Sequence, residues 1–286
     1  MTLDSLPPLT VRSYGSSGPP VLVLHGGPGA PGYLAPLARA LADRFLVLEP
    51  FQRGSSDTPL TVARHVEDLD ALLRSRFPDR SAALVGHSWG AMLALAQAAA
   101  HPHRIRSVAL IGCGTFDGQA RRRMREILDR RTDDALRRCL ESLAQEIPDP
   151  DERLRVRGSL IDRLYLVDPV EAEEDNTPCD ARAHQETWED MLRLQREQVY
   201  PAAFATITAP VLMLHGAEDP HPGRMIRTSL APHLPQLEYR EWPRCGHYPW
   251  LERAVRDEFL EALRTWLAGH PENPAAAADQ PRRVGQ

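Results

Sequence analysis

The stretch Ala83-Leu-Val-Gly-His-Ser-Trp-Gly-Ala-Met92 governs how the rest of the chain is interpreted. Its apolar start predicts a buried strand, Gly86-His-Ser-Trp-Gly90 predicts a sharp turn, and the Ala- and Leu-rich continuation predicts a helix. A serine at the tip of such a turn has a strained backbone, and the flanking glycines let strand and helix approach each other. The pattern therefore favours Ser88 as a nucleophile at the carboxyl edge of a sheet, over a tight structural turn.

The same alternation of strand and helix extends in both directions. Apolar runs predict strands over 9–14, 21–24, 45–48, 82–85, 105–112, 210–214 and 236–240. Periodic apolar residues predict helices over 33–43, 61–77, 88–100, 225–230 and 251–267. This order predicts an α/β fold with a mostly parallel sheet, right-handed crossovers and flanking helices.

The region from about Thr115 to Ala205 contains no run typical of a buried strand. Amphipathic stretches over 121–146, 153–166 and 185–198 predict helices instead. We therefore expect a helical cap over 115–205, inserted late in the sheet and lying above its carboxyl edge. The core is then formed by 1–114 and 206–269, and the segment 270–286 is expected to be a disordered tail.

Composition narrows the possible functions. The chain has 286 residues, 42% of them hydrophobic, and a net charge of −5, so no basic surface suggests nucleic acid. All 34 basic residues are arginine, which excludes a Schiff-base lysine, covalently held pyridoxal phosphate and a P-loop lysine. The four cysteines form no C-x-x-C motif, and no targeting or membrane-spanning segment is evident. We expect a cytoplasmic protein with free thiols and no membrane contact, and the oligomeric state stays open.

Three polar residues follow three predicted strands in the order Ser88, Asp219 and His247. A serine hydroxyl needs a base within hydrogen-bond reach, and the base needs an orienting acid. The sequence therefore predicts a Ser-His-Asp triad at one edge of the sheet. Glu218 is the alternative acid, and a pair of Cys245 with His247 is the alternative nucleophile and base.

The loop His25-Gly-Gly-Pro-Gly29 follows a predicted central strand, where an oxyanion hole is usually built. We expect the backbone N–H groups of Gly27 and Trp89 to bind the oxyanion; the alternative for the loop is a plain tight turn.

The roles of several other residues are less specific. We expect Trp188 and Trp250 either to line a pocket or to fill the core. Arg53 is interpreted as a salt-bridged loop residue rather than an anion ligand. His101-Pro-His103 is interpreted as a helix-terminal turn rather than a metal site.

The chain resembles the α/β-hydrolase superfamily from about Val21 to Leu267, and within it the proline iminopeptidase-like group. The matching motifs are His25-Gly-Gly-Pro-Gly29, Gln52-Arg-Gly54, Gly86-His-Ser-Trp-Gly90 and Gly246-His247. The resemblance implies the same triad and oxyanion donors. The family often has Asp where this chain has Phe51 and Gly where it has His87. It also uses glutamates in its cap to bind the amino group of the substrate, for which the acidic candidates are Glu171, Glu173, Glu174 and Glu189.

These observations predict a serine hydrolase that acts on a small-molecule or short peptide substrate through an acyl-enzyme. The resemblance points to an aminopeptidase of the proline iminopeptidase type. Hydrolysis of an ester, a lactone or a carbon–carbon bond, and biosynthetic cyclisation or acyl transfer, can use the same triad. A non-catalytic member that only binds a ligand is a further alternative. No metal or organic cofactor is expected.

Overall fold

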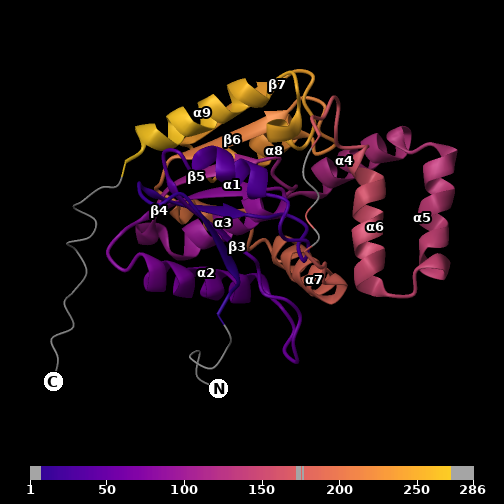
Figure 1. Cartoon of the computed structure of the whole chain (residues 1–286), viewed down its shortest axis with the longest axis horizontal. Helices are drawn as coiled ribbons and strands as arrows, with labels where there is room; N and C mark the ends of the chain where they lie inside the picture. Colours follow the sequence, from indigo (N-terminus) through magenta and orange to yellow (C-terminus); the bar gives the residue numbers. More distant parts are fainter. Residues whose placement is uncertain (1–7, 172–174, 176, 272–286) are drawn as a thin grey trace.

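The computed structural model describes residues 8–171, 175 and 177–271 (Figure 1). In this part of the chain one sheet contains strands in the order β1-β3-β2-β4-β5-β6-β7. Their bounds are β1 Val11–Tyr14, β2 Pro20–Leu24, β3 Leu46–Pro50, β4 Ala82–His87, β5 Ile105–Ile111, β6 Val211–Gly216 and β7 Leu237–Trp242. The edge strand β1 runs antiparallel to β3, and the other neighbouring strands are parallel. The predicted α/β fold with a mostly parallel sheet is confirmed.

Helices cover both faces of this sheet, as Figure 1 shows. On one face lie α2 Val62–Arg76, α3 Trp89–Ala100 and α8 Gly223–Leu230. On the other lie α1 Ala35–Leu41 and α9 Arg256–Gly269. Since the sheet is covered on both faces, its central strands β2, β4, β5 and β6 are buried along their whole length, and most of their residues are apolar, so they are recognisable as hydrophobic runs.

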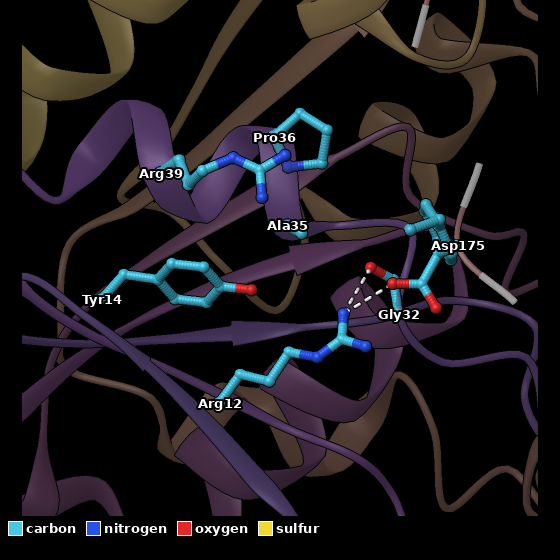
Figure 2. Close-up of a pocket in the computed structure, with 8 residues that line it drawn as sticks. Arg12, Tyr14, Gly32, Ala35, Pro36, Arg39 and Asp175 are labelled. Atoms are coloured by element: carbon cyan, nitrogen blue, oxygen red, sulfur yellow. Dashed lines mark hydrogen bonds and ion pairs between the residues drawn. The ribbon is translucent and has the colours of Figure 1, made fainter. Parts of the chain in front are cut away.

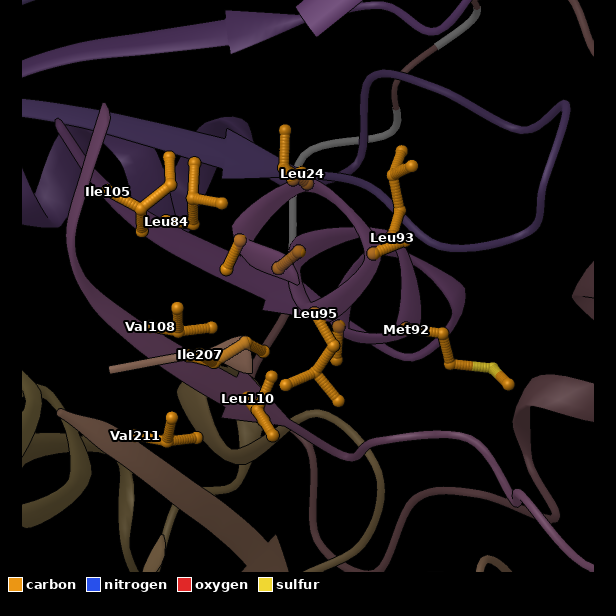
Figure 3. Close-up of a cluster of buried hydrophobic side chains, with 14 of the residues drawn as sticks. Leu24, Leu84, Met92, Leu93, Leu95, Ile105, Val108, Leu110, Ile207 and Val211 are labelled. Carbon is orange, nitrogen blue, oxygen red and sulfur yellow. The ribbon is translucent and has the colours of Figure 1, made fainter. Parts of the chain in front are cut away.

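Alternate residues of one strand enter different cores. Leu22 and Leu24 of β2 pack toward α2 and α3, whereas Val21 and Val23 pack toward α1 and α9. Figure 3 shows the first of these cores, where Leu24, Leu84 and Leu110 from three strands lie near Met92, Leu93 and Leu95 of α3. Burial on both faces fixes the register of the central strands β2, β4, β5 and β6, and with it the positions of the loops that leave their carboxyl edge.

Among the described residues, four α-helices lie between β5 and β6: α4 Gly118–Arg131, α5 Asp134–Glu146, α6 Pro150–Asp162 and α7 Ala181–Arg196. In Figure 1, α4, α5 and α6 project away from the sheet, while α7 lies close to the core. We refer to α4–α7 as the inserted helices. Their place in the chain agrees with the expected insertion, and the division into a core and a cap over 115–205 stays a prediction.

Some predicted boundaries were wrong. The single helical stretch expected over 121–146 is two helices: α4 ends at Arg131 with Thr132 as its C-cap, and Asp133 caps α5 by accepting a hydrogen bond from the N–H of Leu136 at 2.7 Å. Glu49 and Pro50, expected in a loop, are buried residues of β3. Of the predicted tail 270–286, residues 272–286 lie outside the described residues. No helix in the described ranges has the length and apolarity needed to cross a membrane.

Candidate active site

Ser88 lies between β4 and α3 in a backbone conformation that few non-glycine residues adopt, with φ 55° and ψ −117°. The close approach of strand and helix explains the glycines around it. A Cβ at Gly90 would lie 2.0 Å from the carbonyl oxygen of Leu24, and one at Gly86 would lie 2.2 Å from that of Gly90. The expected strand–turn–helix is therefore present, and it exposes Ser88 at the carboxyl edge of the sheet.

Asp219 and His247 meet at the same edge, on the loops that follow β6 and β7. Nδ1 of His247 lies 2.6 Å from Oδ2 of Asp219, and both side chains are buried. The other carboxylate oxygen of Asp219 accepts a hydrogen bond from the backbone N–H of His221 at 2.8 Å. Glu218, the alternative acid, is exposed and makes no such contact with His247 in the described structure. The structure thus pairs Asp219, not Glu218, with the predicted base.

Burial and charge set the protonation of this pair. Burial alone raises the pKa of the Asp219 carboxyl, but His247 and the two other histidines beside it hold that pKa well below its usual value. Burial lowers the pKa of the His247 imidazole below its ordinary value of 6.5, and Asp219 opposes part of that effect. The pair therefore combines a carboxylate with a neutral imidazole, which is the state that a general base requires.

Ser88 is close to this pair without being bonded to it. The ring of the preceding residue, His87, lies 4.5 Å from the ring of His247, and the Ser88 N–H donates to the carbonyl of Ile111 at 2.9 Å. Within the described part of the chain, the Ser88 hydroxyl makes no hydrogen bond to His247. Catalytic hydrogen bonds are commonly long without substrate and tighten in the complex.

The predicted oxyanion donors belong to Trp89, which follows Ser88, and to Gly27, whose neighbour Gly26 approaches Ser88 so closely that a Cβ on it would lie 2.9 Å from that of Ser88. Trp89 is the first residue of α3, so its backbone N–H has no partner within the helix. Gly27 has a φ of +111°, a left-handed conformation suited to glycine. Gln52 joins the two loops: its amide donates to the His25 carbonyl at 2.7 Å and accepts from the Trp89 indole at 2.8 Å.

The helix α7 closes over the loop that contains Gly27. Its His184 donates from Nδ1 to the carbonyl of Pro28 at 2.7 Å, and the indole of Trp188 donates to the carbonyl of Gly27 at 3.3 Å. The Trp188 ring also lies 5.7 Å from that of Trp89. The structure thus brings Trp188 to the candidate site, next to the predicted oxyanion donors.

The other candidate binding residues lie elsewhere. Trp250 is 3% exposed and packs with its ring 4.8 Å from His87, so it belongs to the core behind the site. Glu189 is on the exposed side of α7 and accepts a hydrogen bond from Gln185 at 2.8 Å. Glu171 is exposed, and Glu173 and Glu174 lie outside the described residues.

Arg53 forms a bidentate pair with Asp68 at 2.7 and 2.8 Å, in agreement with its interpretation as a salt-bridged residue.

Sequence reasoning missed the residues that hold the loop of the base. The carbonyl of Tyr165 accepts the His247 N–H at 2.7 Å, and the Tyr165 ring lies 5.2 Å from the imidazole. The buried carboxylate of Glu252 accepts hydrogen bonds from Gly246, Val167 and Asp168 at 2.8–2.9 Å. Both residues come from segments that carry no motif, so no sequence signal identified them.

The remaining nucleophiles and metal ligands are less suited to chemistry here. Burial raises the pKa of the thiols of Cys113 and Cys245, which disfavours the thiolate. The cysteines are free. Among the described residues, the one cluster with metal-ligating groups is Asp219, His221 and His247, and its atoms are bonded to one another within the site described above.

A separate hollow of about 230 Å³ lies beside β1 and α1. Figure 2 shows Tyr14, Arg12 and Arg39 around it, with Arg12 paired to Asp175 at 2.6 Å. None of the described residues that line it belongs to the triad. Arg12 and Asp175 are therefore engaged with each other in this hollow, and Tyr33, which also lines it, hydrogen-bonds to Gly26 and His87 at the candidate site.

The chain has relatives among known proteins. The model of the alpha/beta hydrolase family matches residues 21–262. The chain belongs to this family. A proline iminopeptidase of Lactobacillus helveticus (strain DPC 4571) is 25% identical over 285 residues, 90% of this chain and 92% of that relative. The similarity of this alpha/beta hydrolase to proline iminopeptidases, expected from its motifs, is confirmed.

Two further similarities differ in how much of the chain they cover. The cis-3-alkyl-4-alkyloxetan-2-one decarboxylase of Shewanella oneidensis is 34% identical over 107 residues, so this chain spans about a third of that relative (34%) with 35% of its own length. The structure of a thermophilic esterase from Thermogutta terrifontis has a TM-score of 0.62 at 21% identity, covering 92% of this chain and 94% of that one. The second similarity shows the fold, and the alpha/beta hydrolase is an enzyme of the hydrolase class.

Proposed function

We propose that this alpha/beta hydrolase is a serine hydrolase that transfers the acyl group of a small substrate to water through Ser88. The observation that carries the proposal is the buried pair of Asp219 and His247, with 2.6 Å between carboxylate and imidazole, at the sheet edge that also presents the strained Ser88. A strained serine next to a neutral, oriented imidazole has the parts of an activated nucleophile.

In the proposed mechanism, Nε2 of His247 takes the proton of Ser88 as Oγ attacks the substrate carbonyl. The oxyanion that forms accepts hydrogen bonds from the N–H groups of Gly27 and Trp89. When the tetrahedral intermediate collapses, His247 gives the proton to the leaving group and an acyl-Ser88 remains. Water then attacks this acyl group with His247 again as the base, and Asp219 keeps the imidazole oriented through Nδ1.

For the substrate, we propose an N-terminal prolyl residue, as in an aminopeptidase of the proline iminopeptidase type. The support is the similarity to a proline iminopeptidase along 90% of the chain. In this proposal the insertion 115–205, which contains the inserted helices, acts as a cap that limits the substrate to a small molecule or short peptide.

An ester or lactone is the second candidate, and the acids of α7 favour it. Asp180, Glu186 and Asp190 accept hydrogen bonds from the backbone N–H groups of Ser55, Leu60 and Val62 at 2.7–2.8 Å. Glu189 is bonded to Gln185. These four carboxylates are therefore engaged by other groups of the chain, whereas an aminopeptidase needs an acid for the free amino group of its substrate. One relative, matched over 34% of its length, is a decarboxylase of an oxetan-2-one; that compound is a cyclic ester, so the substrate in the name of this relative, and not its reaction, agrees with the second candidate.

The test compares two panels on purified protein: aminoacyl p-nitroanilides including proline, and short-chain p-nitrophenyl esters. The control is Ser88→Ala. Turnover of the prolyl anilide that is lost in Ser88→Ala would support the peptidase, and turnover of esters alone would support the second candidate. Activity that survives in Ser88→Ala, or a wild-type Ser88 that a fluorophosphonate does not label, would contradict the mechanism.

A further inference from the structure

A chain of three hydrogen bonds crosses the candidate site behind Ser88. The backbone N–H of Gly26 lies 2.7 Å from the hydroxyl oxygen of Tyr33, which lies 2.6 Å from Nδ1 of His87. Nε2 of the same imidazole lies 3.0 Å from the carbonyl oxygen of His247. The chain thus joins the loop after β2, the residue before the nucleophile and the backbone of the proposed base.

The direction of every bond in this chain is determined by its ends. Gly26 N–H can only donate, so the oxygen of Tyr33 accepts from it. The carbonyl of His247 can only accept, so His87 carries its proton on Nε2. Neutral His87 then has a bare Nδ1, and the Tyr33 O–H donates to it. Burial lowers the pKa of His87 well below its ordinary value of 6.5, in agreement with this neutral form.

The chain is enclosed, so a lost bond is not readily replaced by water. His87 is 1% exposed. Its ring lies 5.5 Å from the ring of Tyr33, 5.0 Å from that of Tyr248 and 4.8 Å from that of Trp250. Removing one partner in such surroundings leaves the other with an unsatisfied polar group.

Both ends of the chain lie next to groups that react in the proposed mechanism. Gly26 shares a peptide unit with Gly27, whose N–H is the proposed oxyanion donor. His247 is the proposed base, and its N–H is held by the carbonyl of Tyr165 at 2.7 Å, so both polar backbone groups of this residue are held. The Tyr33 hydroxyl therefore connects the oxyanion loop to the base through a single intermediate side chain.

We propose that Tyr33 and His87 are positioning residues that fix the oxyanion loop relative to His247. This inference rests on the proposed function of Ser88 and adds two residues that act through Gly27 and His247. Loss of the chain is expected to misplace the oxyanion donor and the base, which slows acylation more than it weakens substrate binding.

Tyr33→Phe tests the centre of the chain, and Tyr14→Phe is the matched control. Tyr14→Phe also removes a hydroxyl hydrogen bond, the one to Glu49 at 2.7 Å, but this bond is not part of the chain of three hydrogen bonds. The measurements are the melting temperature, the rate constant of Ser88 labelling by a fluorophosphonate, and kcat and KM on the substrate that the wild-type protein turns over. We expect Tyr33→Phe to lower labelling and kcat about 10- to 100-fold with KM within about twofold. Tyr14→Phe should lower neither.

Two substitutions of His87 separate the halves of the chain and serve if Tyr33→Phe does not fold. The side-chain nitrogen of His87→Gln can replace Nε2 and keep the bond to His247, while the oxygen of His87→Asn can replace Nδ1 and keep the bond to Tyr33. Each should retain more activity than His87→Ala. The double variant Tyr33→Phe with His87→Gln should lose less than the product of the single losses, because both remove the same bond.

The possible results distinguish this inference from the proposed function. If a fluorophosphonate labels Ser88 of folded Tyr33→Phe as fast as Ser88 of the wild-type protein, or if Tyr33→Phe changes KM alone, the positioning role is overturned and the serine hydrolase remains intact. Equal labelling of His87→Ala, His87→Gln, His87→Asn and wild-type protein would also overturn it. A wild-type protein that is not labelled at Ser88 would overturn the proposed function, and the inference with it.

Discussion

The helix behind Ser88 and the inserted helices are stabilised by different kinds of contact. Every residue of α3 from Trp89 to Ala98 is buried, whereas the whole described length of α6 contains no buried residue. The helix α3 is held by packing against the sheet. The helix α6 begins at a cap, where Asp149 accepts from the N–H groups of Asp151 and Glu152 at 3.0 and 2.8 Å.

The helix α7 combines both kinds of contact. Ala183, Thr187 and Met191 are buried against the core, and its acids bind backbone N–H groups of the segment 55–62. Individual polar contacts orient a helix without demanding a particular apolar sequence. The comparison teaches that the sheet edge presents the residues of the proposed triad through burial, which leaves a strong sequence pattern, while the inserted helices are placed by contacts that leave a weak one.

The largest expected effect lies at the sheet edge, in the pair that only tertiary structure brings together. Asp219→Asn should lower kcat by about 10⁴-fold, because the amide no longer holds His247 in the tautomer that accepts a proton from Ser88. The measurement is kcat on the preferred substrate, with the melting temperature to confirm folding. Glu218→Gln is the matched control and should retain activity. The reverse result would assign the acid to Glu218.

A pair of glycine substitutions compares the two regions directly. Gly90→Ala should reduce the free energy of unfolding by about 4 kcal/mol, because the new Cβ meets the Leu24 carbonyl in a core that cannot yield. Gly158→Ala in α6 meets nothing within 4 Å and should stabilise the helix by about 0.5–1 kcal/mol. Denaturant unfolding measures both. A tolerated Gly90→Ala would contradict the tight strand–helix approach inferred at Ser88.

The contact between α2 and α7 should weaken in acid. Burial lowers the pKa of His65 from 6.5 to about 4, and its Nε2 lies 3.0 Å from Oγ1 of Thr187. The unfolded chain then binds the proton first, so stability is complete above pH 6.5 and falls as the pH decreases toward 4. Full burial makes this loss on the order of 3 kcal/mol. The free energy of unfolding, measured between these pH values, should decrease less steeply with falling pH in His65→Gln than in the wild-type protein. Equal slopes in the two proteins would contradict the prediction.

The smallest expected effect concerns one polar contact of α7. Asp190→Ala removes the acceptor for the N–H of Val62, the first residue of α2, and should lower the free energy of unfolding by about 1 kcal/mol. Glu189→Ala, on the exposed side of the same helix, should change it by less than about 0.5 kcal/mol. If the two variants were equal in denaturant unfolding, the docking of α7 would rest on its apolar face alone.

Much of the fold was predictable, for a definable reason. The strand that ends in His87 and the helix that starts at Trp89 are covered by other elements on all sides. Their residues are therefore apolar almost without interruption, which makes both elements easy to predict. The break between α4 and α5 at Asp133 was missed. The amphipathic periodicity of the sequence continues across this residue, while its backbone is extended and its side chain caps a new helix. The glutamates expected to bind an amino group were chosen by charge alone, and charge does not determine which way a side chain such as Glu189 faces.

The sequence by itself determined the family, the sheet with its helices, and the order Ser88, Asp219, His247, because each of these follows from local patterns of burial and from a motif. The tertiary structure alone decided that Asp219 and not Glu218 pairs with His247, that Trp188 lies at the Gly27 loop while Glu189 faces outward, and that Tyr33 and His87 connect the two sides of the site. These contacts join segments up to 161 residues apart, and a hydrogen bond across that distance depends on how strand ends are placed in space, which no local pattern records.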